Sequence, residues 1–179
     1  MILDLTRLPI LETERLRLDP LTPEDAADIF PIVDDPEVMA AWDWPEIDDP
    51  DMVADIIRSQ VEAMAAGRAI HWAIRTLGDA RFVGAIDLTE IDRRHRRAEV
   101  GFKLAKGSWD LGYPMEALTT VTAYAAVSGL RKLSARTYLG ARRSEALLEG
   151  LGFKEEGLLR GHILEDGERR DLRLFGLLL

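Results

Sequence analysis

The run Ala98-Glu-Val-Gly-Phe-Lys-Leu-Ala-Lys106, followed by Trp109-Asp-Leu-Gly-Tyr-Pro-Met-Glu-Ala-Leu118, decides the fold of this chain. Apolar and polar side chains alternate through the first run, which predicts a strand with one apolar face. The second run predicts a helix that begins after Gly112 and ends near Gly129, where glycine suits the C-terminal cap. A strand, a glycine turn and a helix N-terminus in this order form an anion site, because the first N–H groups of a helix have no partner within it.

The residues on either side of this stretch predict a mixed sheet. Leu133–Leu139 returns to a strand pattern, so strand, helix and strand predict two neighbouring parallel strands. Pro31 is expected to kink or shorten the helix that contains it, and residues 34–36 and 42–50 are expected to be loops. Upstream, the predicted strands are Arg15–Asp19, Ile70–Thr76 and Phe82–Glu90, and the predicted helices are Thr22–Val33 and Asp51–Ala66.

The C-terminal part predicts a short helix and a long hairpin. The helix is expected at Arg143–Glu149, before Gly150. The strands Phe153–Ile163 and Arg169–Leu177 flank Asp166-Gly167, a strong two-residue turn signal. The whole sequence therefore predicts one α+β domain over residues 1–179, built on a mixed sheet.

Composition narrows the classes of function. The 179 residues are 47% hydrophobic and 31% charged, as in ordinary globular domains, and carry a net charge of -9. That charge repels nucleic acid and anionic membranes, so we expect neither as a partner. We also expect no signal peptide or transmembrane segment.

Cysteine and histidine usage bears on redox and metal chemistry. The chain has no cysteine, which excludes disulfides, thiolate metal sites and a cysteine nucleophile, and is compatible with a reducing cytosol. We therefore expect a cytoplasmic protein. His71, His95 and His162 are far apart in sequence and lack metal-ligand spacing, so no metal is expected.

Several segments, in the right order, resemble the RimJ/RimL-type branch (ribosomal-protein N-acetyltransferases) of the GNAT superfamily. The resemblance covers almost the whole chain. It rests on Glu14-Arg-Leu-Arg-Leu-Asp-Pro-Leu-Thr-Pro-Glu-Asp-Ala26, Ala98-Glu-Val-Gly-Phe102, Trp109-Asp-Leu-Gly-Tyr-Pro-Met-Glu-Ala-Leu118, and Ser144 through Leu151-Gly-Phe153 and Glu156-Gly157.

The resemblance implies a fold and an activity. The fold is a mixed, mostly antiparallel sheet of about seven strands, flanked by helices, with a V-shaped splay between strands four and five. The activity is transfer of the acetyl group of acetyl-CoA, a co-substrate, to a primary amine, either a protein N-terminal α-amino group or a small amine. The residues expected to bind acetyl-CoA are Phe102, Leu104, Trp109, Asp110, Leu111, Gly112, Tyr113 and Met115.

Four positions depart from the family pattern, and one of them is Leu111, where the family usually has a cation or a polar residue. Asp110 replaces the usual glycine, and its carboxylate is expected to cap the helix and to repel a phosphate by roughly 1–3 kcal/mol. Pro114 removes one N–H group, and Ala141 stands where the family has asparagine. These departures leave open an alternative function, a GNAT-fold binding or regulatory module with weak or no turnover.

Two residues are candidates for catalysis. Ser144 matches the serine that the RimJ/RimL branch uses to protonate the leaving thiolate; alternatively, its hydroxyl caps the short helix. Glu99 is a candidate base acting through water, or simply a half-exposed strand carboxylate. A backbone N–H group within 102–104 is expected to stabilise the oxyanion.

A tryptophan pair and a basic run each allow two interpretations. Trp42 and Trp44, among acidic residues, either wall the acceptor site or pin a loop to the core. The basic run Arg93-Arg-His-Arg-Arg97 is either a solvated hairpin tip or a contact for an acidic partner or a distal phosphate. The sequence leaves the acceptor amine open, as well as the choice between monomer and homodimer.

Overall fold

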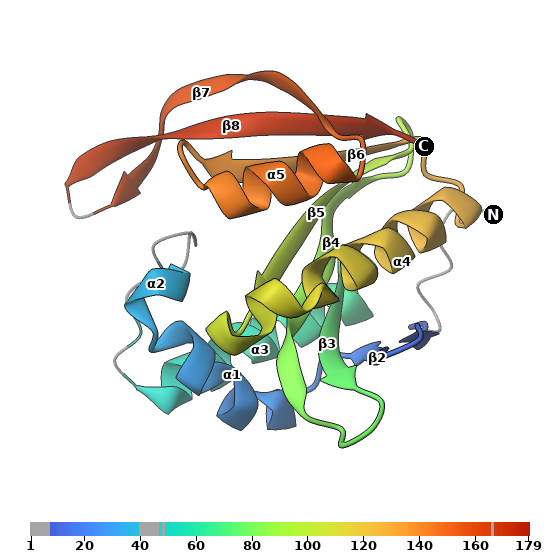
Figure 1. Cartoon of the computed structure of the whole chain (residues 1–179), viewed down its shortest axis with the longest axis vertical. Helices are drawn as coiled ribbons and strands as arrows, with labels where there is room; N and C mark the ends of the chain where they lie inside the picture. Colours follow the sequence, from blue (N-terminus) through green and yellow to red (C-terminus); the bar gives the residue numbers. More distant parts are fainter. Residues whose placement is uncertain (1–7, 40–46, 48, 166) are drawn as a thin grey trace.

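A computed structural model describes residues 8–39, 47, 49–165 and 167–179, which form an open mixed sheet with helices on both faces (Figure 1). Its strands follow the order β1-β2-β3-β4-β5-β6-β8-β7, and only the β5–β6 pair is parallel. The strands are β1 (Leu11–Glu12), β2 (Leu16–Pro20), β3 (Ile70–Thr76), β4 (Phe82–Asp92), β5 (Arg97–Leu104), β6 (Lys132–Tyr138), β7 (Lys154–Glu165) and β8 (Glu168–Leu178).

The sheet confirms the predicted α+β fold, with a correction to the strand count. About seven strands were expected, and eight are present, because β1 adds a two-residue edge strand. Two residues are too few to give an alternating pattern, so the sequence carried no signal for it. The predicted fourth and fifth strands are therefore β5 and β6.

Helix α3 begins where its capping residues predict it. At α3, the Asp51 N–H group donates to the Asp49 carboxylate, and Pro50 occupies the first turn. A short helix begins at Pro36, where a loop was expected, and α1 continues through Pro31 to Val33. The helices are η1 (Pro23–Asp25), α1 (Ala26–Val33), α2 (Pro36–Met39), α3 (Pro50–Ala65), η2 (Lys106–Leu111), α4 (Tyr113–Val127) and α5 (Arg142–Gly150).

Two apolar clusters hold the helices to the sheet. The larger cluster joins α4 to one face, with Leu118 and Val121 packed among Trp72, Leu88 and Val100. The smaller cluster lies under α1 and α3 on the other face and is built from residues such as Ile29, Val53 and Ile57. In Figure 1, α5 lies beside β6 and β8, apart from α4. None of the helices in the described ranges is both long and apolar enough to span a membrane.

The parallel strands separate after a short contact. The β5–β6 pairing covers only three positions and ends at Glu99 and Ser134. Beyond that point β6 stays paired with β8 along its whole length, while β5 stays paired with β4. The predicted V-shaped splay is thus present, and it leaves two strand edges facing each other across a gap.

Candidate active site

The gap presents backbone groups that no neighbouring strand can use. Ala105 donates its N–H to the Val83 carbonyl, which fixes the alternation along β5: odd-numbered residues bond to β4 and even-numbered residues face β6. The N–H groups of Phe102 and Leu104 therefore point into the gap, past the last paired residue. The Leu104 carbonyl accepts the indole N–H of Trp109 at 2.8 Å, which ties the following loop to the end of β5.

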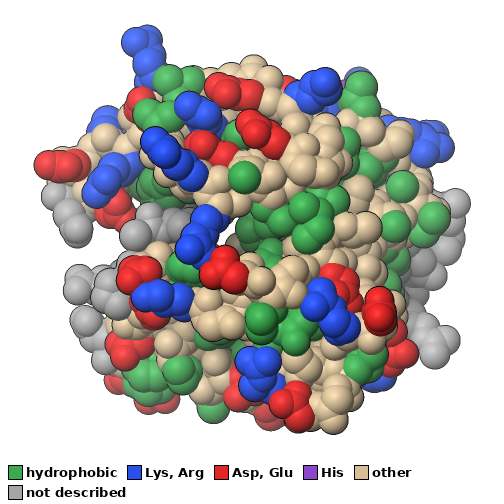
Figure 2. Space-filling model, viewed as in Figure 1, with side chains coloured by type: hydrophobic (Ala, Val, Ile, Leu, Met, Phe, Trp, Pro, Cys, Tyr) green, Lys and Arg blue, Asp and Glu red, His purple; other side chains and the backbone are tan. Residues whose placement is uncertain are grey.

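A cavity of about 670 Å³ opens from this gap toward α4 and α5, on the side where the sequence resemblance places acetyl-CoA, and for that reason we call it the donor-side cavity. Phe102, Leu104, Trp109 and Asp110 line it from the β5 side, together with Pro114. Residues 140–144 and 146–147 line it from the α5 side. Figure 2 shows the molecule hollowed between its upper and lower halves, with hydrophobic side chains beside the hollow.

Four of the eight residues expected to bind the cofactor do not line this cavity. Gly112 is the N-cap of α4 with a φ of 77°, a left-handed conformation that glycine adopts without strain. The Leu111 carbonyl accepts from Arg15 Nη1 at 2.8 Å, and the Tyr113 ring lies 4.8 Å under the Arg15 guanidinium. Met115 is partly exposed, and its carbonyl accepts the Thr119 hydroxyl. These four residues shape the loop from outside the cavity.

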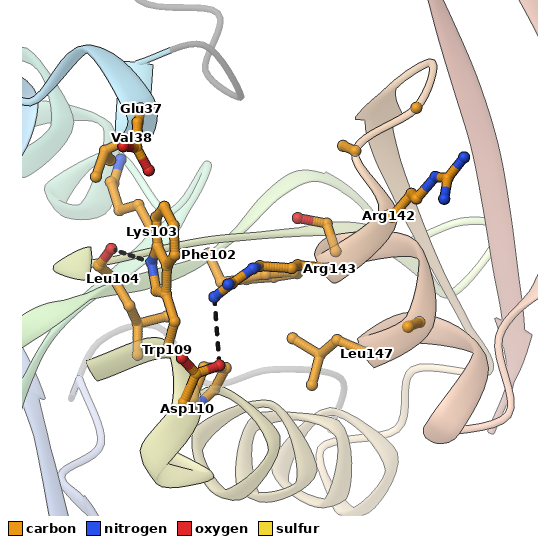
Figure 3. A pocket seen from close by; sticks show the side chains of 15 residues that line it. Glu37, Val38, Phe102, Lys103, Leu104, Trp109, Asp110, Arg142, Arg143 and Leu147 are labelled. Carbon is orange, nitrogen blue, oxygen red and sulfur yellow. Dashed lines mark hydrogen bonds and ion pairs between the residues drawn. The ribbon is translucent and has the colours of Figure 1, made fainter. Parts of the chain in front are cut away.

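Asp110 does not cap the helix, contrary to expectation. The N-cap of α4 is Gly112, and no side chain in the described residues caps it. The Asp110 carboxylate turns instead to Arg143, whose Nη1 lies 3.3 Å from its Oδ1. The same guanidinium lies 5.0 Å from the centre of the Trp109 ring, so Arg143 reaches across the cavity from α5 (Figure 3).

Glu116 clamps the start of α4 to the segment before β2. Its carboxylate accepts the Thr13 hydroxyl and the Arg15 N–H group, and it pairs with the Arg15 guanidinium at 2.6 Å. Partial burial opposes ionisation, but these hydrogen bonds outweigh it, and the pKa of Glu116 is lowered. Glu116 therefore connects the start of α4 to the segment before β2.

We expect Glu116→Gln to lower the free energy of unfolding by about 1–3 kcal/mol at pH 7, because hydrogen bonds to a charged group are lost. Since the folded-state pKa lies below the unfolded one, this stabilisation is present above the ordinary glutamate pKa and is lost as the pH falls. Urea unfolding at pH 7, 5 and 3 measures it, with Glu149→Gln as the control on another helix. A difference that stays constant down to pH 3 would contradict the ion-pair assignment.

A second cavity of about 370 Å³ lies beside the gap under α3, on the side where the sequence resemblance places the acceptor amine, and for that reason we call it the acceptor-side cavity. Gln60 of α3 covers it, and Glu99 and Arg136 line it from β5 and β6. Both cavities share one set of lining residues, namely Phe102, Lys103, Ala141 and Ser144. The two cavities therefore meet at the gap.

Glu99 lies in the wall of the acceptor-side cavity, largely buried and paired. Burial raises its pKa, the Arg136 guanidinium at 2.8 Å opposes that rise, and the charges of Glu90 and Asp87 reinforce it. Arg136 also binds Glu90 at 2.8 Å, so the two glutamates share one cation. A carboxylate in this setting takes up a proton more readily than an exposed one.

Ser144 is the only candidate catalytic residue from the sequence that lines both cavities in the described structure. Its alternative role as a helix cap is wrong, because Ala141 is the N-cap of α5 and Ser144 lies three residues further on. Its hydroxyl is thus not required to start the helix.

Three residues that line these cavities were not among the expected site residues. His71 and Asp87 are opposite each other on β3 and β4, with Nδ1 and Oδ2 3.7 Å apart, and both line the acceptor-side cavity. The Asp87 carboxylate occupies the space over Gly101, where a Cβ would lie 2.8 Å from its Oδ1. Burial lowers the pKa of Lys103, with the Asp87 charge opposing. A polar residue on an otherwise buried strand is the signal that could have indicated these positions.

Two other expectations have separate outcomes. Arg93–Arg97 contains the tight turn between β4 and β5, and its residues are exposed, so the interpretation as a hairpin tip is confirmed. Trp42 and Trp44 lie outside the described residues, as do most of the acidic residues around them.

Comparison with known proteins gives a family match over most of the chain. The acetyltransferase (GNAT) domain family matches residues 15–154. An uncharacterized N-acetyltransferase of Bacillus subtilis strain 168, YoaA, is 28% identical over 170 residues, which span 94% of this chain and 96% of that protein.

Solved structures share the same fold. A structure of RimL, the ribosomal L7/L12 alpha-N-protein acetyltransferase, in complex with coenzyme A aligns with a TM-score of 0.86 and 15% identity, over 96% of this chain and 98% of that one. The spermidine N-acetyltransferase of Vibrio cholerae, in complex with CoA and spermine, aligns with a TM-score of 0.81 and 19% identity, over 93% and 96%. At these identities the likeness concerns the fold.

Proposed function

Because the chain belongs to the GNAT acetyltransferase family, we propose that it transfers the acetyl group of acetyl-CoA to a primary amine. The observation that carries the proposal is the meeting of two cavities at the opened strand pair, at Phe102, Lys103, Ala141 and Ser144. A thioester in the donor-side cavity and an amine in the acceptor-side cavity would reach each other only there.

The residues of the donor-side cavity fit a thioester with an amide-rich arm. The N–H groups of Phe102 and Leu104 face the gap and supply donors for amide or thioester oxygens. The acceptor-side cavity offers a further polar group, because the buried Thr137 hydroxyl in its wall has no hydrogen-bond partner among the described residues. Buried polar atoms of this kind normally have a hydrogen-bond partner, so a ligand bound beside Thr137 would supply the missing partner.

The protein groups divide the chemistry as follows. Acetyl-CoA supplies an activated acyl group when bound. The N–H group of Phe102 or Leu104 stabilises the developing oxyanion, and Ser144 donates a proton to the departing sulfur. Glu99 accepts the proton of the amine, directly or through water, on the acceptor side.

The acceptor is either a protein N-terminal α-amino group or a small amine. An α-amino group has a pKa near 7.7–8.0 and needs little help to lose its proton, whereas a lysine-like amine near 10.4 depends on a base. RimL and the spermidine enzyme represent these two kinds of acceptor among the proteins of similar fold. Free-thiol release from acetyl-CoA, measured against a panel of peptides, polyamines and amino acids, tests the proposal. Acetyl-CoA binding without thiol release for any amine would favour the alternative of a binding module.

We expect Glu99→Gln to lower kcat/KM about tenfold to a hundredfold for a polyamine, and less for a peptide N-terminus, because only the polyamine depends on a base. Glu90→Gln is the matched control, since Glu90 binds the same Arg136 but does not line the cavity. Steady-state kinetics with both amines measure the effect. Equal losses in the two variants would show that the ion pair matters, rather than the proton acceptor.

A further inference from the structure

Arg143 occupies an unusual position in the donor-side cavity. It projects from the first turn of α5, lies against the Trp109 ring and ends at the Asp110 carboxylate, as Figure 3 shows. The neighbouring Arg142 points away from Asp110 in the same view. One arginine of the pair therefore spans the cavity between α5 and the loop that leads into α4.

The contact between Arg143 and Asp110 is weak enough to exchange. Both side chains are largely exposed, at 67% for Arg143 and 88% for Asp110, and exposed ion pairs contribute little free energy in water. A diphosphate offers more negative charge and several acceptor oxygens to the planar guanidinium. A diphosphate entering the cavity would therefore displace Asp110 as the partner of Arg143.

We propose that Arg143 is a diphosphate-binding residue of the acetyl-CoA site, which Asp110 holds in place until the cofactor arrives. The inference rests on the proposed function for the identity of the ligand, but it assigns a role to two residues of this chain. Stacking on Trp109 keeps the guanidinium beside the loop after its anionic partner is exchanged. The Asp110 carboxylate, which was expected to repel the phosphates, is thus paired with the Arg143 cation.

A double-mutant cycle on CoA binding, followed by calorimetry, tests this exchange. Arg143→Ala is expected to weaken the CoA dissociation constant about tenfold to thirtyfold, because charged hydrogen bonds to phosphate are lost. Asp110→Ala is expected to tighten it about threefold to tenfold, because Arg143 no longer has a competing partner. In the Arg143→Ala background the same Asp110 substitution should tighten the constant by a clearly different factor, because it then relieves only the direct repulsion between the carboxylate and the phosphates. If the effects of the two substitutions on the CoA dissociation constant are simply additive, the proposed exchange of partners at Arg143 is wrong.

The phosphate in question is identified by shortening the ligand. The effect of Arg143→Ala should be equal for CoA and dephospho-CoA, which both contain the diphosphate, and absent for acetylpantetheine, which does not. An effect that disappears with dephospho-CoA would overturn the diphosphate assignment. Arg142→Ala removes the same charge one residue away, and a loss as large as that of Arg143→Ala would reduce the result to general electrostatics and overturn the proposal. If CoA binds unchanged to Arg143→Ala, this inference fails alone; if the unmodified protein binds no CoA, the proposed function fails.

Discussion

Ser144→Ala is expected to lower kcat about a hundredfold to a thousandfold, while the melting temperature changes by less than about 2 °C. A general acid typically contributes a factor of this size, because without it the sulfur departs as a thiolate with no proton donor at hand. Stability should be retained because Ala141, and not Ser144, is the N-cap of α5. Single-turnover thiol release and differential scanning calorimetry measure the two quantities.

The control for this substitution is Ser128→Ala, at the far end of α4, where the serine is the C-cap and lies outside both cavities. It removes an identical hydroxyl and should leave kcat within about twofold of the unmodified protein. Unchanged thiol release in Ser144→Ala would remove Ser144 from the mechanism. A lowered melting temperature with normal turnover would return it to a structural role.

The second large effect is expected at Gly84, which pairs with Leu104 where β5 borders the gap. A Cβ at this position would lie 2.2 Å from the Lys103 carbonyl oxygen and 2.8 Å from the Leu104 Cα, and both are backbone atoms. Gly84→Ala therefore forces β4 and β5 apart, and its φ of +156° adds strain. We expect the free energy of unfolding to fall by about 3–5 kcal/mol.

Gly84→Ala should weaken CoA binding as well as stability, because it displaces the part of β5 that carries the Phe102 and Leu104 N–H groups. Urea unfolding and CoA calorimetry should therefore both detect the substitution. Gly78→Ala is the matched control, since its Cβ would meet no atom within 4 Å. Wild-type stability in Gly84→Ala would mean that the two strands do not approach each other as described.

The strands and helices were largely predictable, because periodicity reports which face of an element is buried. Ile70–Thr76 was predicted with the bounds of β3, and the parallel pairing followed from the strand–helix–strand order at Leu133–Leu139. Short elements were not predictable: β1 has two residues and α2 has four, too few for either period.

The site was predictable only where it depends on the backbone of one segment. Phe102 and Leu104 face the gap because of their place in one strand, and that place can be read from the sequence. The Arg143–Asp110 pair joins residues 33 positions apart, and His71 and Asp87 meet only through the sheet register. Local patterns carry no information about such contacts. For this reason the sequence treated Asp110 as a helix cap and missed its partner.

The two cavities on either side of the opened strands have a consequence for how such a protein diversifies. Gln60 of α3 lines only the acceptor-side cavity, whereas Trp109 and Asp110 of the loop before α4 line only the donor-side cavity. Under the proposed function, substitutions around Gln60 would change which amine is admitted without changing the residues that bind the thioester. Under that function, selectivity for the amine and binding of the thioester would evolve separately on one scaffold.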